Sequence, residues 1–194
     1  VGQLMSTRPD LLPEHVTSAL ERLQDDVGPF PFDHVVRTIE RDLGRPLGAL
    51  FAEVAPVPLA SASVAQVHRA RLHDGRIVAV KVRRPDLPEL CAFDLAVMKK
   101  VARLLAKIPA LRGLAPEAAV GEFARAISAQ LDLRVEAANN ARFRTNFAGQ
   151  NDVVFPEVIP ALSSERVLTM TFLEGTKILS VGQMRADPKH IARI

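Results

Sequence analysis

Between Ala55 and Val82 the chain changes from a helical period to the two-residue period of β-strands. Val64–Leu72 and Ile77–Val82 are rich in small and β-branched residues, and the sequence His73-Asp74-Gly75 lies between them. Aspartate followed by glycine is typical of a tight turn, and two strands joined so closely pair with each other. The sequence therefore predicts an antiparallel β-hairpin at its centre, which any fold for this chain must accommodate.

The segments on either side of this hairpin have apolar residues at helical spacing. The first 44 residues predict two helices, one beginning near Pro13 and a second whose apolar stripe ends at Gly44. Downstream, Leu90–Ile108 and Pro116–Phe147 are each predicted to form one helix. The apolar face of the helical prefix needs a partner, so we expect the prefix to pack on the later part of the chain.

Two short strands and a polar helix complete the pattern. Val153–Phe155 and Arg166–Phe172 are predicted as strands, and a helix that contains Pro188 comes after them. Helices, strands, helices and strands in that order predict an α+β fold with a small, mostly antiparallel sheet. No internal repeat is present, and one domain accounts for the whole pattern.

Composition excludes several classes of function. The 194 residues include one cysteine, Cys91, and five scattered histidines, so we expect neither a disulfide nor a metal site. Net charge is only +3, and tryptophan and tyrosine are both absent, which argues against nucleic-acid binding. No apolar run approaches the ~18 residues of a membrane span, and the start of the chain lacks a secretory signal.

Lys81 ends a strand rich in valine and isoleucine, and Asp132 and Glu136 are spaced to share one face of a helix. A strand lysine that is oriented by a helix glutamate can hold the phosphates of a nucleotide. Alternatively, Lys81 is an exposed strand end, and the two acids are surface groups that pair with Arg134 or Arg142. The first interpretation requires Lys81 and Glu136 to meet across a cleft.

The small residues Ala60-Ser61-Ala62-Ser63 form a turn that leads into the hairpin. Small side chains allow backbone amides to approach an anion, and serine hydroxyls add hydrogen-bond donors. The same residues would also suit a tight turn that feeds an edge strand. A glycine-rich GxGxxG loop is absent, so the residues alone predict no more than a phosphate site.

Together these residues resemble the UbiB/AarF family of atypical, protein-kinase-like proteins associated with ubiquinone and isoprenoid-lipid metabolism. Pro58–Ala70 is similar to the alanine-rich loop that this family has in place of the kinase glycine-rich loop. Val78–Lys81 resembles the kinase Val-Ala-Ile-Lys strand, and Gln130–Ala138 resembles the family segment that contains the lysine-pairing glutamate. Gln130 stands where the family usually has an acid. Arg166–Gly175 is similar to the strand and hinge between the two kinase lobes.

The resemblance implies a kinase-like N-terminal lobe at residues 55–194, preceded by a helical extension at residues 1–54. Val1-Gly2-Gln3 matches the end of the family's Lys-x-Gly-Gln motif, so Gly2 and Gln3 are the expected regulatory residues of that extension. Lys81 and Glu136 are the expected catalytic pair. The resemblance implies that the nucleotide is held by the loop, by the strand before Lys81 and by the hinge: Ala60, Ser61, Ala62, Ser63, Val64, Ala79, Met170, Thr171, Phe172 and Leu173.

We therefore expect the ATP-binding lobe of an atypical kinase or ATPase, with ATP and Mg²⁺ as cofactors. The resemblance places the catalytic loop and the main Mg²⁺ ligands in a C-terminal lobe outside this chain, and the chain alone is expected to have little or no turnover. A cytoplasmic location is expected, with membrane attachment through regions outside this chain. The sequence predicts no oligomeric state and no phosphoryl acceptor.

An alternative of a different class is a non-catalytic regulator. In that interpretation the lobe senses nucleotide or associates with lipid. The helical prefix and the helices around Leu90–Ile108 then offer a docking face to a membrane or to partner enzymes. The neutral Gln130 favours this alternative, because it removes a charge that the family usually has.

Overall fold

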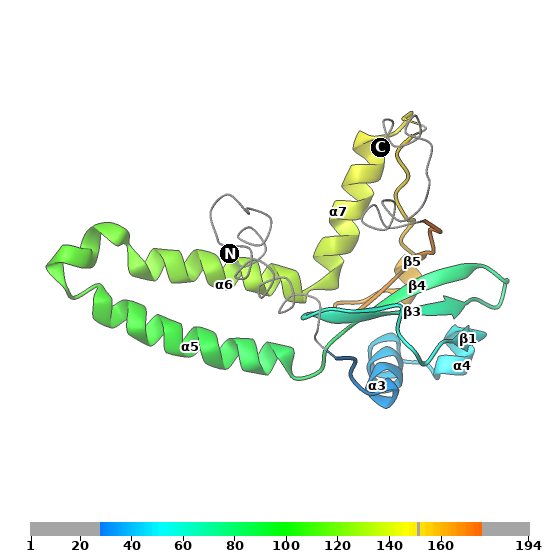
Figure 1. Ribbon diagram of the computed structural model, residues 1–194, viewed down its shortest axis with the longest axis horizontal. Helices are drawn as coiled ribbons and strands as arrows, with labels where there is room; N and C mark the ends of the chain where they lie inside the picture. The colour runs from blue at the N-terminus through cyan, green and yellow to red at the C-terminus, as the bar shows by residue number, and fades with distance from the viewer. Residues whose placement is uncertain (1–27, 151, 176–194) are drawn as a thin grey trace, which may run out of the picture.

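The computed structural model describes residues 28–150 and 152–175. Gly2 and Gln3, the helix predicted from Pro13 and the helix predicted around Pro188 lie outside these residues. The described chain is an α+β structure, in which helices pack on one antiparallel sheet and a pair of long helices projects away from it (Figure 1). The fold class predicted from the sequence is confirmed.

The predicted hairpin forms the centre of the sheet. β3 (Ala65–Arg71) and β4 (Ile77–Arg83) pair in antiparallel register along their whole length. β5 (Val167–Thr171), which lies within the strand predicted at Arg166–Phe172, pairs with the other edge of β4. Two short strands, β1 (Glu53–Val54) and β2 (Ala60–Ser61), pair with β3, so the strand order is β1-β3-β4-β5 with β2 beside β3.

One face of the sheet is closed by the second predicted helix. α3 (Phe32–Leu43) ends at Gly44, whose φ of +67° is the left-handed conformation that glycine adopts easily. Val35 and Ile39 of α3 are fully buried together with Val78, Val80 and Val82 of β4. The short α4 (Leu47–Leu50) adds Leu50 and then Phe51 to the same core. The described part of the prefix therefore packs on the sheet, as its apolar stripe predicted.

The core side of β3 also contains buried polar groups that are hydrogen-bonded to one another. His68 Nδ1 lies 2.8 Å from the Ala55 carbonyl oxygen, and its Nε2 lies 2.8 Å from the amide nitrogen of Gln66. A neutral ring that is protonated on Nδ1 satisfies both contacts. Burial lowers the pKa of His68 below its ordinary value, although the bond to Ala55 opposes this shift. The neutral His68 ring therefore fixes the loop before β2, through Ala55, without adding a charge to the core.

Two long helices come after the hairpin and project away from the sheet. α5 (Leu87–Leu105) and α6 (Pro116–Leu131) run antiparallel and are joined through a 3₁₀ segment, Pro109–Leu114 (Figure 1). α5 corresponds to the helix predicted at Leu90–Ile108. Within the described residues, none of the helices combines the length and the apolarity that crossing a bilayer requires.

The prediction of one helix at Pro116–Phe147 was wrong. The chain breaks at Asp132, which has an extended backbone, and α7 (Leu133–Asn146) begins in a new direction. The Asp132 carboxylate accepts a hydrogen bond from the backbone N–H of Arg134 at 2.9 Å, which caps the start of α7. Leu133 is 1 % exposed, so burial of this side chain accompanies the change of direction. Asp132 is consequently the cap of α7 and not a residue within one long helix, although it lines the same cavity as Glu136.

The strand predicted at Val153–Phe155 is also absent from the described residues. Instead, Phe155 packs against Phe143 and Phe147 at the end of α7, with ring centroids 5.6 and 5.4 Å apart. The alternation of apolar residues here reflects this aromatic cluster and not a pairing with the sheet. Further along, Val158 forms an isolated bridge with Met170, and a 3₁₀ turn (Pro160–Leu162) leads back to β5.

Candidate functional site

Lys81 lies on the sheet face that α3 leaves uncovered. Alternation along β4 places Val80 and Val82 in the core, so Lys81 and Ala79 point to the opposite side. Directly opposed residues of an antiparallel pair share a face, and Lys81 is flanked by Val67 on β3 and Leu168 on β5. Leu168 is fully buried, which gives the lysine stem an apolar floor.

Lys81 and Glu136 meet, as the sequence predicted. The ammonium Nζ donates to both carboxylate oxygens of Glu136, at 2.9 and 2.6 Å, and so connects β4 to the first turn of α7. The two side chains are 25 % and 44 % exposed, so water reaches the pair. An exposed ion pair of this kind contributes little to stability. Its geometry instead fixes the position of one cationic amine at the edge of an open space.

That open space is a cavity of about 680 Å³ between the sheet and the α6–α7 junction. Its walls come from the end of the small-residue loop, from β4 and from both helices. The lining residues are Ser63, Val64, Lys81, Ala129, Gln130, Asp132, Leu133, Val135, Glu136 and Asn139. The cavity falls in the range of volumes that small-molecule sites occupy. Polar side chains from the loop, the strand and the helices therefore border one cavity.

The small-residue loop is held by Arg84, whose role the sequence did not reveal. The Arg84 guanidinium donates to the carbonyl oxygen of Ala62 at 2.8 Å and to the hydroxyl of Ser61 at 2.9 Å. Its backbone N–H donates to the carbonyl of Val64 at 2.9 Å. Burial lowers the pKa of Arg84 below its ordinary value. Arg84 thus fixes both ends of the turn whose tip, Ser63, borders the cavity.

Arg83 holds the other wall, where α6 gives way to α7. Its side chain is 6 % exposed, donates to the carbonyl oxygen of Leu131 and forms an ion pair with Glu165 at 3.0 Å. The backbone N–H of Leu133 donates to the carbonyl oxygen of Glu165 at 2.9 Å. These contacts bring the helix break against β4 and β5. Because Lys81 and Arg83 share one face of β4, the strand is joined to the helix junction at two points.

Asp132 borders the cavity but is already engaged. Both of its carboxylate oxygens accept hydrogen bonds from the Arg134 side chain, at 2.8 to 3.2 Å. These bonds hold the pKa of Asp132 below its ordinary value. For Asp132 the structure therefore shows the alternative interpretation, in which this acid pairs with Arg134. No cluster of three or more His, Cys, Asp or Glu side chains among residues 28–150 and 152–175 is arranged to hold a metal ion.

Some of the remaining predicted residues line this cavity, and the others lie elsewhere on the sheet or beyond it. Ala60 and Ser61 form β2, and among the loop residues only Ser63 and Val64 line the cavity. Ala79 and Met170 are paired across β4 and β5, on the same sheet face as Lys81. Thr171 pairs with Val78 and so lies on the core side, while Phe172 donates its N–H to the Ile77 carbonyl at 3.2 Å. Leu173 is 45 % exposed beyond the end of β5.

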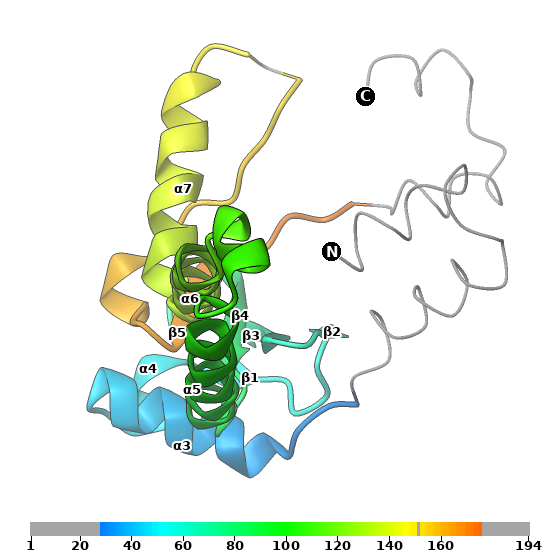
Figure 2. The same ribbon diagram turned by 90° about the vertical axis from the view of Figure 1, so that its left-hand side faces the viewer.

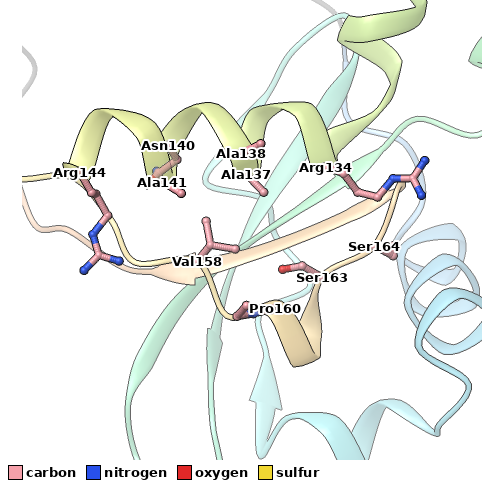
Figure 3. Close-up of a pocket in the computed structure, with 10 residues that line it drawn as sticks. All are labelled: Arg134, Ala137, Ala138, Asn140, Ala141, Arg144, Val158, Pro160, Ser163 and Ser164. Atoms are coloured by element: carbon pink, nitrogen blue, oxygen red, sulfur yellow. The ribbon is translucent and has the colours of Figure 1, made fainter. Parts of the chain in front are cut away.

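The opposite face of α7 borders a second cavity, of about 400 Å³, that the sequence did not predict (Figure 3). Ala137 and Ala141 of α7 face Val158 and Ser163 across it, and Arg134 and Arg144 lie at its two ends (Figure 3). The side-chain oxygen of Asn140, which also lines this cavity, is buried and has no hydrogen-bond partner among the described residues. α7 therefore stands between two cavities and touches the sheet mainly at its first turn.

Comparison with known proteins shows the family of this chain. A family model described as the ABC1 atypical kinase-like domain matches residues 22–194. The chain belongs to this family. It is 42 % identical over 188 residues to a protein named probable protein kinase UbiB from Vibrio atlanticus, and 40 % identical over the same length to its namesake in Vibrio cholerae. These matches cover 96 % of this chain and 35 % of each relative, so the chain spans about a third of their length.

A solved structure shows the same fold. The complex of Rv3197 with erythromycin from Mycobacterium tuberculosis matches 97 % of this chain and 48 % of its own, with a TM-score of 0.69 and 28 % identity. The resemblance to the UbiB/AarF proteins that the sequence motifs indicated is thereby confirmed. The kinase-like fold, like the family, is thus established by more than the motifs alone.

Proposed function

We propose that this lobe binds ATP in the cavity at Lys81 and that the protein to which it belongs is an atypical kinase or ATPase. The observation that carries the proposal is the contact of Lys81 Nζ with both oxygens of Glu136, at the edge of a cavity bordered by Ser63 and Val64. A lysine oriented in this way can contact the α- and β-phosphates of a nucleotide. Membership of the kinase-like family supports the same assignment.

In this proposal the chain's own residues position the nucleotide. Lys81 holds the phosphates, Glu136 orients Lys81, and the loop fixed by Arg84 covers the phosphates from above. Ala79 and Met170, on the same sheet face, are proposed to contact the adenine, with Thr171 to Leu173 as the hinge. Phosphoryl transfer depends on positioning and on electrostatic stabilisation, including that by Mg²⁺. The Mg²⁺ ligands and the remaining catalytic groups are proposed to lie outside the described residues.

The resemblance found in the sequence motifs implies a role of the whole protein in ubiquinone or isoprenoid-lipid metabolism, and we include this role in the proposal. The name of the relatives, probable protein kinase UbiB, is consistent with it. The kinase or ATPase activity of the whole protein is part of the same proposal, as are lipid or quinone-pathway enzymes as its partners at a membrane. This chain without the rest of the protein is expected to show little or no turnover.

The test is Mg-ATP binding and phosphate release by the intact protein, compared with its Lys81→Ala and Glu136→Gln variants. Loss of one charged contact to phosphate costs about 1.5–3 kcal/mol, so Lys81→Ala should weaken ATP binding by roughly ten- to a hundredfold. Glu136→Gln keeps the shape but removes the charge that orients Lys81, and its effect should be smaller on binding than on phosphate release.

The control variants are Lys107→Ala and Glu89→Gln, which change exposed residues of the same types on or next to α5. Both control variants should bind Mg-ATP and release phosphate as the wild type does. If the Lys81 and Glu136 variants bind Mg-ATP with unchanged affinity, the proposed site is wrong.

One observation favours a second candidate, a regulator that binds nucleotide without turning it over. Gln130 lines the cavity at a position where the family pattern identified from the sequence has an acid, so the cavity has one negative charge fewer than that pattern implies. Binding of Mg-ATP by the intact protein with no phosphate release would favour the regulator, and a Gln130→Glu variant that gained release would assign the difference to this residue.

A further inference from the structure

α7 positions Glu136 but has few buried contacts of its own. Of its fourteen residues, all of which the structure describes, only the first, Leu133, is buried. Figure 2 shows the helix rising away from the sheet, with residues 152–158, which we name the returning segment, running back beside it. The rings of Phe143 and Phe155 stack between the two, with centroids 5.6 Å apart. Contacts between α7 and the returning segment therefore affect where Glu136 lies.

The cavity of about 400 Å³ in Figure 3 lies along one side of α7. Residues spaced by three, four and three positions share that side of the helix: Arg134, Ala137, Ala141 and Arg144. The alanine side chains leave the middle of the cavity open, and Val158 and Pro160 make the facing wall apolar. A cavity of this volume with an apolar middle suits the body of a small molecule.

Several polar groups of this cavity are already engaged within the protein. The hydroxyls of Ser163 and Ser164 donate to other protein oxygens, at 2.9 and 2.7 Å. The Arg134 guanidinium is held by both carboxylate oxygens of Asp132. These groups therefore have little hydrogen-bonding capacity left for a ligand.

Two other groups that line the cavity, Arg144 and Asn140, remain available. Arg144 lies 4.0 Å from Glu157, which is too long for a hydrogen bond, and the two side chains are 45 % and 62 % exposed. The Asn140 oxygen is buried without a hydrogen-bond partner among the described residues, a costly state that a donor would relieve. Because the two residues are one helical turn apart, their Cβ atoms are separated by roughly 6 Å.

We propose that this cavity binds a small apolar carboxylic acid that also has one N–H or O–H donor. The carboxylate pairs with Arg144, the donor satisfies the Asn140 oxygen, and the apolar body contacts Ala141 and Val158. A loosely paired guanidinium at the end of the cavity favours an acid over an amine, since a carboxylate forms charge-assisted hydrogen bonds with it.

The bound acid holds α7 against the returning segment, in the position where Glu136 meets Lys81. A ligand that binds one arrangement better than the others raises the population of that arrangement. The acid and ATP should therefore each tighten the binding of the other, by about fivefold or more. This coupling rests on the proposed nucleotide site, whereas the binding of the acid does not.

Isothermal titration of the intact protein with indole-3-propionate, an apolar acid with one N–H, tests the site without nucleotide. A ligand of about fourteen non-hydrogen atoms that fits its cavity should bind with a Kd of about 1 mM or lower. Arg144→Gln should weaken binding by roughly tenfold, and Arg144→Lys should weaken it less because the charge is kept. Ala141→Leu should fill the middle of the cavity and prevent binding. Thermal melting verifies that each variant is folded.

Two matched controls locate the contact. Indole-3-propionamide, which lacks the negative charge, should bind the wild type roughly tenfold more weakly than the acid does, and Arg144→Gln should not weaken it further. Arg142→Gln removes an exposed arginine that is on α7 but does not line this cavity, and it should bind the acid as the wild type does. Absence of binding at several times the expected Kd, or equal losses in the Arg142 and Arg144 variants, would overturn the proposed site.

Titration of Mg-ATP with and without saturating indole-3-propionate tests the coupling. ATP should bind about fivefold tighter when the cavity is occupied, and Ala141→Leu should abolish this response to the acid. An unchanged ATP affinity in the presence of bound acid would overturn the coupling. The nucleotide site itself is judged by Lys81→Ala in the absence of the acid, so failure of that site and failure of the coupling give different results.

Discussion

Replacing Ile39 by alanine is expected to destabilise the lobe by about 2–5 kcal/mol, the largest effect on stability that we predict. Ile39 lies on α3, is fully buried and packs in one core with Val78, Val80 and Val82 of β4. The substitution removes apolar contacts and leaves a cavity that the surrounding side chains fill only partly. Because the core is shared, the sheet and α3 should lose stability together.

Hydrogen exchange measures this result directly. In Ile39→Ala the amides of β4 and those of α3 should both exchange faster, by a similar factor. Arg37→Ala, on the exposed side of the same helix, should leave both sets unchanged within about 0.5 kcal/mol. Faster exchange of α3 alone would mean that the helical extension and the sheet unfold separately, in agreement with a domain boundary at residue 54.

Replacing Arg83 by methionine is expected to lower stability by about 2–3 kcal/mol and to weaken ATP binding in the same variant. Arg83 is 6 % exposed and donates to the carbonyl of Leu131, so its loss leaves that acceptor unpaired and removes the ion pair with Glu165. The helix break would then be less well fixed, and α7 would carry Glu136 away from Lys81. Methionine fills a similar volume, which limits any cavity effect.

Denaturant unfolding of the intact protein and ATP titration of the same sample separate the two effects. The control is Arg76→Met, which removes an arginine whose ion pair with Asp74 is 59 % and 50 % exposed. Such an exposed pair contributes less than about 1 kcal/mol, and ATP binding should not change. An Arg83→Met protein that is destabilised but binds ATP with wild-type affinity would show that Arg83 supports the fold without positioning α7.

The features that the sequence predicted correctly depend on local pattern. The hairpin is predicted by strand periodicity around His73-Asp74-Gly75, and the end of α3 is predicted by Gly44. The meeting of Lys81 with Glu136 was also predicted, because a strand lysine and a helix glutamate in this order match a known family arrangement.

The features that the sequence did not predict depend on tertiary contacts. The apolar period runs through Asp132 without interruption, so one helix was predicted there. The break becomes favourable through contacts from distant parts of the chain, since Arg83 binds the Leu131 carbonyl and the backbone carbonyl of Glu165 accepts from the N–H of Leu133. Asp132 is a preferred N-cap residue and Glu136 is an acid in the first turn after it, and these local signals could have indicated the break.

The Arg84 contacts to the small-residue loop had no local signal either. Arg84 is separated from Ser61 by more than twenty residues, and the hairpin register alone brings the two together. The prediction of a strand at Val153–Phe155 was wrong for the opposite reason, because here a local signal was present and was misleading. Its alternating apolar residues are a valid strand pattern, but Phe155 packs in an aromatic cluster on α7 and does not pair with the sheet.

Covalent labelling with an ATP analogue that has an acylating group on its terminal phosphate tests most directly whether Lys81 faces a bound nucleotide. The reagent transfers its acyl group to a lysine amine close to the bound phosphates, and mass spectrometry of the digested intact protein identifies the modified residue. We predict that Lys81 is acylated and that an excess of unmodified ATP suppresses the labelling. Acylation of only the exposed lysines Lys99, Lys100 and Lys107, or labelling of Lys81 that ATP does not suppress, would contradict the proposed site.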